Sequence, residues 1–175
     1  MHRVLGQPSW DAVRVQISAK TDYALRALCV LALAPGEAPV KADDIAEAQG
    51  IPRAFLDGIL LDLRRGGLVA SRRGPVGGHR LARAPRDITV AEVARVIDGP
   101  LAMVSGARPE HRAYEGPAES LQQVWVALRA AVRGVLETTT LEMIVTGRLP
   151  ESVTSLSCQP DSWVSVWPRR GGAPG

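Results

Sequence analysis

A short segment rich in glycine and proline restricts the fold most: residues 73–78 read Arg-Gly-Pro-Val-Gly-Gly. Glycine and proline at this density favour a turn and interrupt any regular element. The flanking residues 68–72 and 79–83 read as two short strands, so the sequence predicts a β-hairpin. The patterns found elsewhere in the chain are helical, and we therefore expect a mainly α protein with a small β wing.

Three helical patterns precede the hairpin. The first begins at Ser18 and ends at Pro35, with apolar residues recurring at helical spacing between them. The second covers residues 42–49 and stops at Gly50. The third covers residues 52–65; it opens with a proline, whose missing N–H is tolerated at a helix start, and two glycines follow it.

A fourth helix is predicted after the hairpin. Thr89 and Glu92 have the spacing of a capping box ahead of an apolar run that ends at Gly99. Residues 101–118 contain two glycines and two prolines, and we expect them to form a loop.

A long amphipathic helix is predicted within residues 119–147, opened by a Ser-x-x-Gln cap. Its apolar residues recur at helical spacing: Leu121, Val124, Trp125, Leu128, Val132 and Val135. A short helix should follow, capped by Thr139 and Glu142. Residues 148–175 form a tail, and residues 1–15 show no periodicity and read as a flexible arm.

The arginines are distributed unevenly along the chain. Residues 63–86 contain seven arginines and no acid, whereas the formal net charge of the whole chain is only +3. The remaining residues therefore carry a net charge of −4. A concentrated basic segment on an otherwise acidic protein is typical of a nucleic-acid surface, although a solvated loop and helix face would look the same.

The order of these elements is typical of a winged helix-turn-helix, here residues 16–100. In this fold the third helix enters the major groove and the hairpin, or wing, contacts the DNA backbone or the minor groove. On the third helix, Arg53, Ala54 and Asp57 lie off the apolar stripe and are expected to face base edges, together with Gly58 and Leu61. Phosphate or minor-groove contacts are expected from Arg64, Arg65, Arg72 and Arg73.

Other classes of protein are disfavoured. The longest apolar run, residues 24–34, is interrupted by Arg26 and is too short to cross a bilayer, and no signal peptide is visible, so we expect a cytoplasmic protein. Cys29 and Cys158 are too far apart in sequence to form a metal knuckle or a disulfide framework. No nucleophile, base and orienting group converge by motif, and we do not expect an enzyme.

The chain resembles the Rrf family of bacterial winged helix-turn-helix transcription regulators over roughly residues 16–149. Within the winged helix-turn-helix, the resemblance rests on five segments: residues 18–33, Asp44-Ile45-Ala46 to Gly50-Ile51, Phe55-Leu56, residues 63–69 and the wing motif of residues 73–78. Further along the chain, it rests on Asp98-Gly99-Pro100 and on the helix that ends in Thr-Thr-Leu-Glu. These motifs occur in the order that the family shows.

The resemblance implies a homodimer in which the long helix of one chain crosses that of its partner. Two recognition helices, residues 52–65, and two wings, residues 69–83, would then meet a pseudo-palindromic operator in double-stranded DNA. The implied dimer interface consists of Leu121, Val124, Trp125, Leu128, Val132 and Val135.

The resemblance also assigns roles to residues of the recognition helix and wing. A base-contacting acid of the family falls on Asp57, and hydroxyls used by some members fall on Ala54 and Phe55, where they are absent. The wing tip that reaches the minor groove falls on Arg73, Gly74 and Pro75. The expected DNA-binding set is Arg53, Ala54, Phe55, Asp57, Arg64, Arg65, Arg72, Arg73, Gly74 and Pro75.

The chain lacks the cysteines with which some members of the family bind an iron–sulfur cluster. Cluster-binding members of the family carry three cysteines in the loop after the fourth helix, and residues 99–119 contain none. Thiolates hold iron–sulfur clusters, so we expect a cluster-free branch with no cofactor. We expect a repressor. Two alternatives stay open: a regulatory module whose DNA binding is controlled by a partner protein or small-molecule effector, and a thiol or metal redox sensor using Cys29, Cys158 or Asp22.

One hypothesis concerns the start of the chain. Members of the family usually begin just before the segment that corresponds to residues 16–18. A start at Val15 through a non-AUG codon would leave residues 1–14 untranslated.

Overall fold

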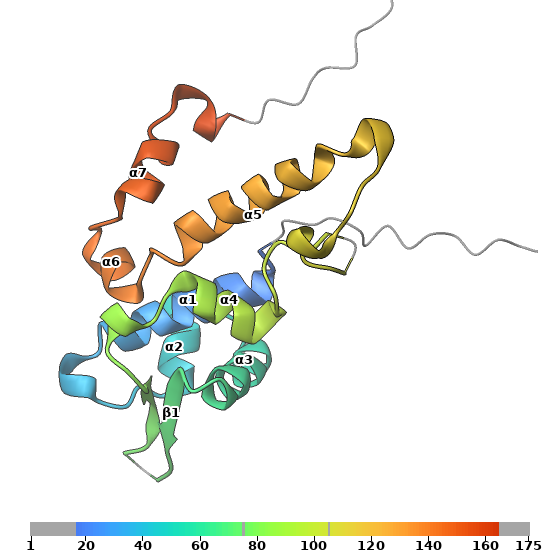
Figure 1. Cartoon of the computed structure of the whole chain (residues 1–175). Helices are drawn as coiled ribbons and strands as arrows, with labels where there is room; N and C mark the ends of the chain where they lie inside the picture. Colours follow the sequence, from blue (N-terminus) through green and yellow to red (C-terminus); the bar gives the residue numbers. More distant parts are fainter. Residues whose placement is uncertain (1–16, 75, 105, 165–175) are drawn as a thin grey trace, which may run out of the picture.

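The computed structural model describes residues 17–74, 76–104 and 106–164 (Figure 1). The predictions for the arm of residues 1–15, for Pro75 and for the end of the tail fall outside these residues. The described residues form a mostly helical structure with one two-stranded antiparallel sheet, which confirms the predicted fold class of a mainly α winged helix-turn-helix.

The helices and strands follow the predicted order. The α-helices and strands are α1 (Ala19–Ala32), α2 (Ala42–Gln49), α3 (Arg53–Arg65), β1 (Val69–Arg72), β2 (Gly78–Leu81), α4 (Val90–Asp98), α5 (Leu121–Leu136), α6 (Leu141–Thr146) and α7 (Glu151–Ser157). Short 3-10 turns lie at Pro35–Glu37, Pro85–Asp87, Pro109–His111, Gly116–Ala118 and Pro160–Trp163.

Helix α1 lies at the centre of the core and packs against α2, α3, α4, α6 and β2. Its apolar stripe, with Ala24, Ala27 and Leu28, is fully buried. The neighbouring elements contribute the other large side chains that solvent does not reach: Ile45, Leu56, Ile59, Leu63, Leu68, Ile88, Val93 and Leu141. A buried aliphatic side chain stabilises a fold by about 1.5–3 kcal/mol, so this cluster fixes how α3 and the hairpin are presented.

A polar contact fastens the start of α1 to the end of α4. Asp98 accepts hydrogen bonds from the hydroxyls of Ser18 and Thr21, both at 2.7 Å. Ser18 also caps α1, because its hydroxyl oxygen accepts from the backbone N–H of Thr21 at 3.0 Å. Thr21 is fully buried, so its hydroxyl needs this partner. The Asp98-Gly99-Pro100 motif therefore joins two helices that are far apart in sequence.

The hairpin is held against the helices by its second strand. β1 and β2 pair with Val69 opposite Leu81 and Arg72 opposite Gly78. His79 of β2 also pairs with Val40, with both backbone hydrogen bonds at 2.8 Å. A Cβ atom on Gly78 would lie 2.6 Å from the carbonyl oxygen of Val40, so only glycine allows this close approach. The base of the wing is thus fixed, and its tip projects away from the helices (Figure 1).

The C-terminal helices differ in part from the prediction. Helix α6 is capped by Thr140, whose hydroxyl oxygen accepts from the N–H of Met143, so the predicted Thr139 cap is wrong by one residue. Thr139 is buried instead, and its hydroxyl donates to Val135 at 2.7 Å. Ser120 precedes α5 but makes no side-chain capping bond. Helix α7 lies within the tail, where no helix was expected.

Candidate DNA-binding surface

The turn between α2 and α3 sets the position of α3. Gly50 ends α2 in the left-handed conformation with φ of 60°, which glycine adopts at low cost. The N–H of Ile51 then bonds to the carbonyl of Ala46 at 2.9 Å. Ile51 and Leu56 are both buried and close the angle between the two helices. Because this turn is short and its apolar residues are packed, α3 is held rigidly on α2.

One face of α3 is buried and the other is exposed. Leu56, Ile59, Leu60 and Leu63 form the buried face. The exposed residues include all those predicted to meet DNA from this helix: Arg53, Ala54, Phe55, Asp57, Arg64 and Arg65, with Gly58 and Leu61 among them. The exposed side of α3 therefore presents charged and small side chains to solvent.

Arg53 links two acidic residues on this face. Its Nε donates to Asp43 of α2 at 2.7 Å, and Nη1 pairs with Asp57 one turn further along α3. Hydrogen bonds to Asp57 and to Asp43 raise the pKa of Arg53. The predicted base-contacting carboxylate of Asp57 is thus already engaged by a neighbouring cation, which the sequence analysis did not anticipate.

Phe55 lies at the edge of the surface rather than within the core. Its side chain is 49% exposed, although the apolar periodicity of α3 includes this position. The ring makes an edge-to-face contact with Tyr23, with centroids 5.9 Å apart. Arg26 lies over the other ring of the pair, 5.3 Å from the centroid of Tyr23. An exposed aromatic ring held in this way offers an apolar contact where the resemblance implied a lost hydroxyl.

The basic segment of residues 63–86 divides into two groups. Arg72 and Arg73 are exposed, and neither has a hydrogen-bond or ion-pair partner among the residues that the structure describes; Gly74 is exposed beside them. Arg64 donates weakly to Ser71 at 3.4 Å. Arg83, by contrast, pairs with Glu92 of α4 at 2.5 Å, and Arg86 lies 4.0 Å from Asp87. Within this segment, Arg72 and Arg73 therefore keep their guanidinium groups open to solvent, whereas Arg65, like Arg83 and Arg86, lies beside an acid.

A hollow of about 290 Å³ lies between α3 and β2, lined by Asp57, Leu60, Leu61, Arg64 and His79. Nδ1 of His79 is buried without a partner among the described residues. Burial lowers the pKa of His79, and the positive charge of Arg53 lowers it further. His79 was not among the predicted site residues; the structure pairs it with Val40 and places it beside α3.

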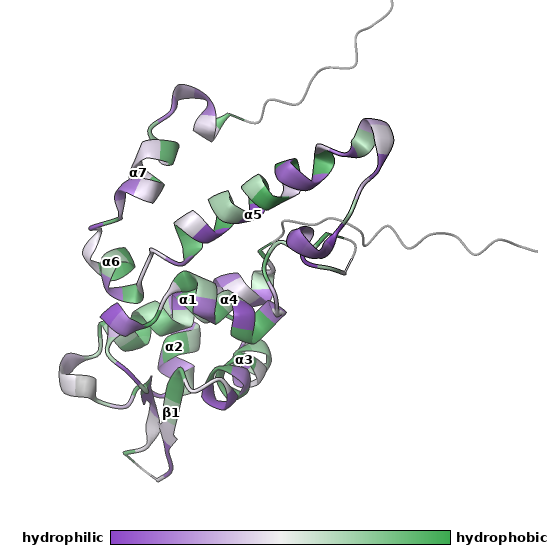
Figure 2. Cartoon of the chain, in the orientation of Figure 1, coloured by the Kyte–Doolittle hydropathy of each residue, from purple (hydrophilic) through white to green (hydrophobic). Residues whose placement is uncertain are grey.

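The residues predicted for a dimer interface all lie on α5, and no residue of this helix is buried in the single chain. Val124, Val126 and Leu128 are 55%, 41% and 37% exposed. Leu121, Trp125, Val132 and Val135 are half-buried. Figure 2 shows hydrophobic residues along much of α5, which stands apart from the core.

The residues named as alternative sensors, Asp22, Cys29 and Cys158, do not gather into a metal site. Within residues 17–74, 76–104 and 106–164, no three His, Cys, Asp or Glu side chains gather in a way that could hold a metal ion. Asp22 instead pairs with Arg26 at 3.5 Å. Burial raises the pKa of Cys29, which makes its thiol less reactive, and Cys158 is exposed. No helix of the described part is both long and apolar enough to cross a membrane.

Several known proteins are similar to this chain in sequence and in fold. The family described as "Rrf2: Iron-dependent Transcriptional regulator" matches residues 17–147. A protein of Mycobacterium tuberculosis named as an HTH-type transcriptional regulator, Rv1287, is 49% identical over 82% of this chain and 89% of its own length. CymR of Bacillus subtilis, an HTH-type transcriptional regulator, is 35% identical over 73% of this chain and 88% of its own.

Two solved structures have a similar fold. That of CymR, the global cysteine regulator of B. subtilis, covers 75% of this chain and 97% of its own, with a TM-score of 0.65 and 35% identity. That of T. potens IscR covers 76% of this chain and 88% of its own, with a TM-score of 0.62 and 32% identity. The whole sequence contains two cysteines, and residues 99–119 contain none.

Proposed function

Because the chain belongs to the Rrf2 family of DNA-binding transcriptional regulators, we propose that it binds a pseudo-palindromic operator as a homodimer and represses transcription there. The relatives are regulators rather than enzymes, and so is this chain. It belongs, in this proposal, to a cluster-free branch of the family.

The exposed face of α3 beside Arg72 and Arg73 of the wing carries the proposal. Arg53, Asp57 and the small residues around them are the right size to approach base edges in the major groove. Arg72 and Arg73 project from the adjoining hairpin without partners among the described residues, as phosphate or minor-groove contacts require. The hollow lined by both elements shows that α3 and β2 border one continuous surface.

The exposed apolar residues of α5 support the dimer. A 16-residue helix with no buried side chain and with Val124, Val126 and Leu128 open to solvent leaves apolar area uncovered in a single chain. Val124 and Leu128, four residues apart, lie on one face of α5, and an exposed apolar face of this kind marks an interaction site. Pairing two such helices would cover this area and place two copies of α3 on one side of the dimer, as a two-fold operator requires.

The half-buried Cys29 and the absence of cysteine from residues 99–119 support the cluster-free assignment over a thiol or cluster sensor. We expect protein purified without oxygen to be colourless and free of iron. Stoichiometric iron together with visible absorbance would contradict this part of the proposal.

Selection from randomised duplex DNA tests the proposal. Purified full-length protein should enrich an inverted repeat whose half-sites are about one helical turn apart, roughly 10 base pairs. A reporter gene placed downstream of that sequence should be expressed more strongly when the protein is absent. Enrichment of no sequence, or of a single unpaired half-site, would contradict operator binding by a dimer.

A further inference from the structure

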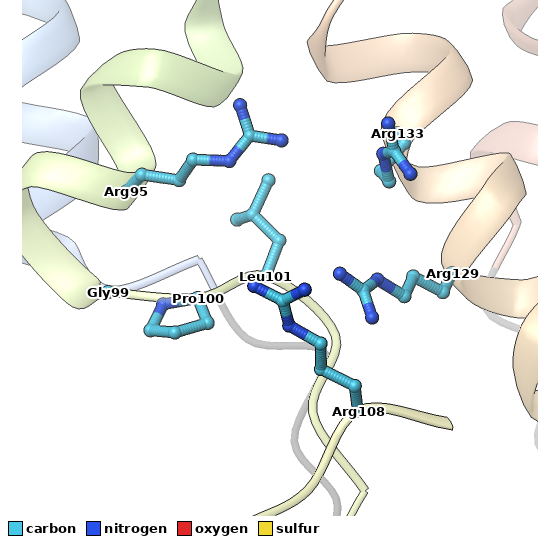
Figure 3. Close-up of a pocket in the computed structure, with 7 residues that line it drawn as sticks. All are labelled: Arg95, Gly99, Pro100, Leu101, Arg108, Arg129 and Arg133. Atoms are coloured by element: carbon cyan, nitrogen blue, oxygen red, sulfur yellow. The ribbon is translucent and has the colours of Figure 1, made fainter. Parts of the chain in front are cut away.

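A pocket of about 250 Å³ lies between α4, the loop that follows it and α5 (Figure 3). The lining residues are Arg95, Gly99, Pro100, Leu101, Arg108, Arg129 and Arg133. Four of these seven residues are arginines, and Figure 3 shows their guanidinium groups around one space, with Leu101 among them. The pocket therefore combines positive charge from two helices and a loop with a small apolar wall.

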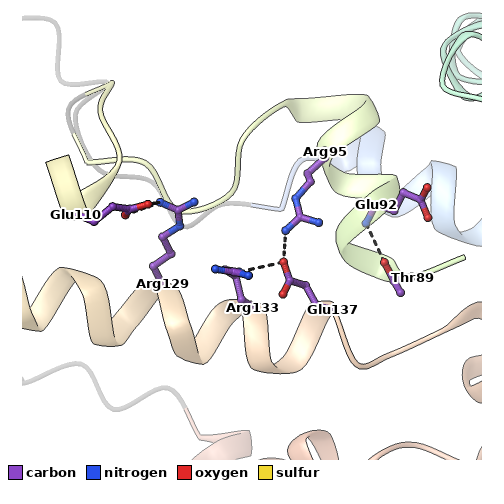
Figure 4. A network of polar contacts seen from close by, with 7 residues as sticks. All are labelled: Thr89, Glu92, Arg95, Glu110, Arg129, Arg133 and Glu137. Atoms are coloured by element: carbon purple, nitrogen blue, oxygen red, sulfur yellow. Dashed lines mark hydrogen bonds and ion pairs between the residues drawn. The ribbon is translucent and has the colours of Figure 1, made fainter.

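Two glutamates neutralise part of this charge. Glu137 accepts from Arg133 at 3.0 Å and also pairs with Arg95, so it joins α5 to α4 (Figure 4). Hydrogen bonds from Arg133 and Arg95 lower the pKa of Glu137. Glu110 receives Arg129 at 2.7 Å. Two carboxylates against four guanidinium groups leave a net charge of +2 at the pocket.

Some of the nitrogen donors at the pocket lack a partner. Nε of Arg129 is buried and donates to no acceptor among the described residues, and Arg108 has no ion pair within the described part of the chain. Asp98, which precedes the lining residue Gly99, does not supply the missing charge, because its oxygens accept from Ser18 and Thr21. A buried guanidinium N–H without an acceptor is unfavourable, so the pocket is suited to a ligand that accepts hydrogen bonds.

We propose that this pocket binds a small anion with two or more carboxylate or phosphate groups. Arginine donates to both groups through paired N–H bonds, and bonds between charged groups are stronger than neutral ones. The volume is slightly below the roughly 300–1,000 Å³ of pockets for drug-sized ligands, which suits a small metabolite. The site is separate from the proposed DNA-binding surface, since it shares no lining residue with the hollow between α3 and β2.

The ligand would control how α5 is held. In the structure, Glu137 joins Arg95 of α4 to Arg133 of α5, and Arg129 of α5 is held by the loop residue Glu110. A multivalent anion would bind the same arginines from both sides and fix α5 relative to α4. This step rests on the proposed function, because in a dimer built on α5 the angle of that helix sets the distance between the two copies of α3.

Isothermal titration calorimetry on the full-length protein in 0.15 M NaCl tests binding, with pyrophosphate and citrate as probes and acetate as the monovalent comparison. One site per chain should bind pyrophosphate or citrate at least tenfold more tightly than acetate. Preference for pyrophosphate would identify a phosphorylated ligand, and preference for citrate a polycarboxylate. Equal binding of all three anions, or none by either probe, would overturn the proposal.

Matched variants locate the site. Arg108→Ala and Arg129→Ala should each weaken probe binding at least tenfold, whereas Arg148→Ala, outside the pocket, and Arg73→Ala, on the wing, should leave it unchanged. Because Arg108 has no described partner, its replacement should leave the circular dichroism spectrum and melting temperature as in the wild type. Loss of binding in Arg73→Ala with retention in Arg108→Ala would place the anion on the DNA surface and overturn the proposal.

A second measurement separates the pocket from its regulatory role. On the selected operator, the tighter probe should change the affinity of the wild type for DNA at least threefold and that of Arg108→Ala not at all. Probe binding without any DNA binding would contradict the proposed function but support the pocket. DNA binding that the probe changes equally in both proteins would overturn the regulatory role.

Discussion

Arg53, the first residue of α3, donates from Nε to the carboxylate of Asp43 in α2 over 2.7 Å. The same guanidinium pairs with Asp57, so a chain of three charges runs from α2 onto the exposed face of α3. All three side chains are substantially exposed, and the pairs contribute little to stability. Within α3, the pair with Arg53 sets where the Asp57 carboxylate points in the free protein.

Replacing Asp57 should relax sequence choice at one base pair. Because a carboxylate accepts from the cytosine amino group, we expect Asp57→Ala to lose about 1–3 kcal/mol of discrimination at that position. Fluorescence anisotropy with the selected operator and its single-base variants measures this. Asp43→Ala, which removes the other partner of Arg53, should keep the same base preference; unchanged discrimination in Asp57→Ala would exclude a base contact.

Arg73→Ala should weaken DNA binding to all sequences alike. A contact with phosphate releases counterions, so the slope of log affinity against log salt should become less steep by about 1. Arg86→Ala is the matched control, since that arginine lies beside Asp87 and away from the wing. If Arg73→Ala and Arg86→Ala had equal slopes, the wing tip would not be a phosphate contact.

Gly58→Ala should have opposite effects on stability and DNA binding. A Cβ atom there meets nothing within 4 Å in the free protein, and alanine favours the helix by about 1 kcal/mol. On the exposed face of α3, that added methyl group would reduce the affinity for DNA. Gly66→Ala should instead lower the melting temperature, because its Cβ would lie 2.6 Å from Val96. A Gly58→Ala protein with wild-type affinity would show that no close approach occurs here.

Thr21→Val should destabilise the protein by about 1–3 kcal/mol, since it removes a hydrogen bond to Asp98 from a fully buried side chain of the same shape. Thr146→Val, where the hydroxyl is exposed and donates to a carbonyl of its own helix, should change stability by less than about 0.5 kcal/mol. Urea unfolding of both variants compares them directly. Similar losses in the two would remove Asp98 as the link between α1 and α4.

Stability should fall as the pH is lowered below about 6.5, through His79. Burial, and then the charge of Arg53, lower its pKa below the usual 6.5, so below that pH the unfolded chain binds more protons than the folded one. The loss ends once the folded imidazole is also protonated. Glu137 and Glu110, whose pKa values are lowered from 4.5, lose their stabilisation only in more acidic solution.

Unfolding in urea between pH 7 and 5 measures this dependence. His79→Gln should flatten it, whereas His111→Gln, at an exposed position, should leave it as in the wild type. A slope that His79→Gln does not change would assign the proton uptake to another group.

Local patterns in the sequence predicted the order of the elements well. Apolar spacing and glycine stops defined α1 to α4, and the Thr89 cap is present, with its hydroxyl accepting from Glu92 at 3.2 Å. Two neighbouring threonines were harder to distinguish, because the backbone pairing of Thr89 with Thr140 decides which one caps α6. The missed helix α7 is seven residues long and has no side-chain cap, so its local signal was weak.

The site was only partly predictable for a similar reason. Helical spacing predicts that Asp57 is exposed. Its ion pair with Arg53 depends on the side-chain rotamers, and the ion pair between Arg53 and Asp43 depends on the angle between α2 and α3. The place of His79 depends on a bridge to Val40, a residue 39 positions earlier. The arginine pocket combines residues from α4, a loop and α5, which no single pattern connects.

Because no side chain of α5 is buried, this helix should unfold locally more easily than the helices of the core. Helix α1 packs in the apolar core, so its amides should exchange their protons only when the whole core opens, whereas those of α5 should exchange through local fraying. Contact with a second copy would slow that fraying in proportion to protein concentration. The helices packed around α1 should therefore keep their structure in dilute solution, whereas α5, already helical in the single chain, should become more resistant to fraying when two copies meet.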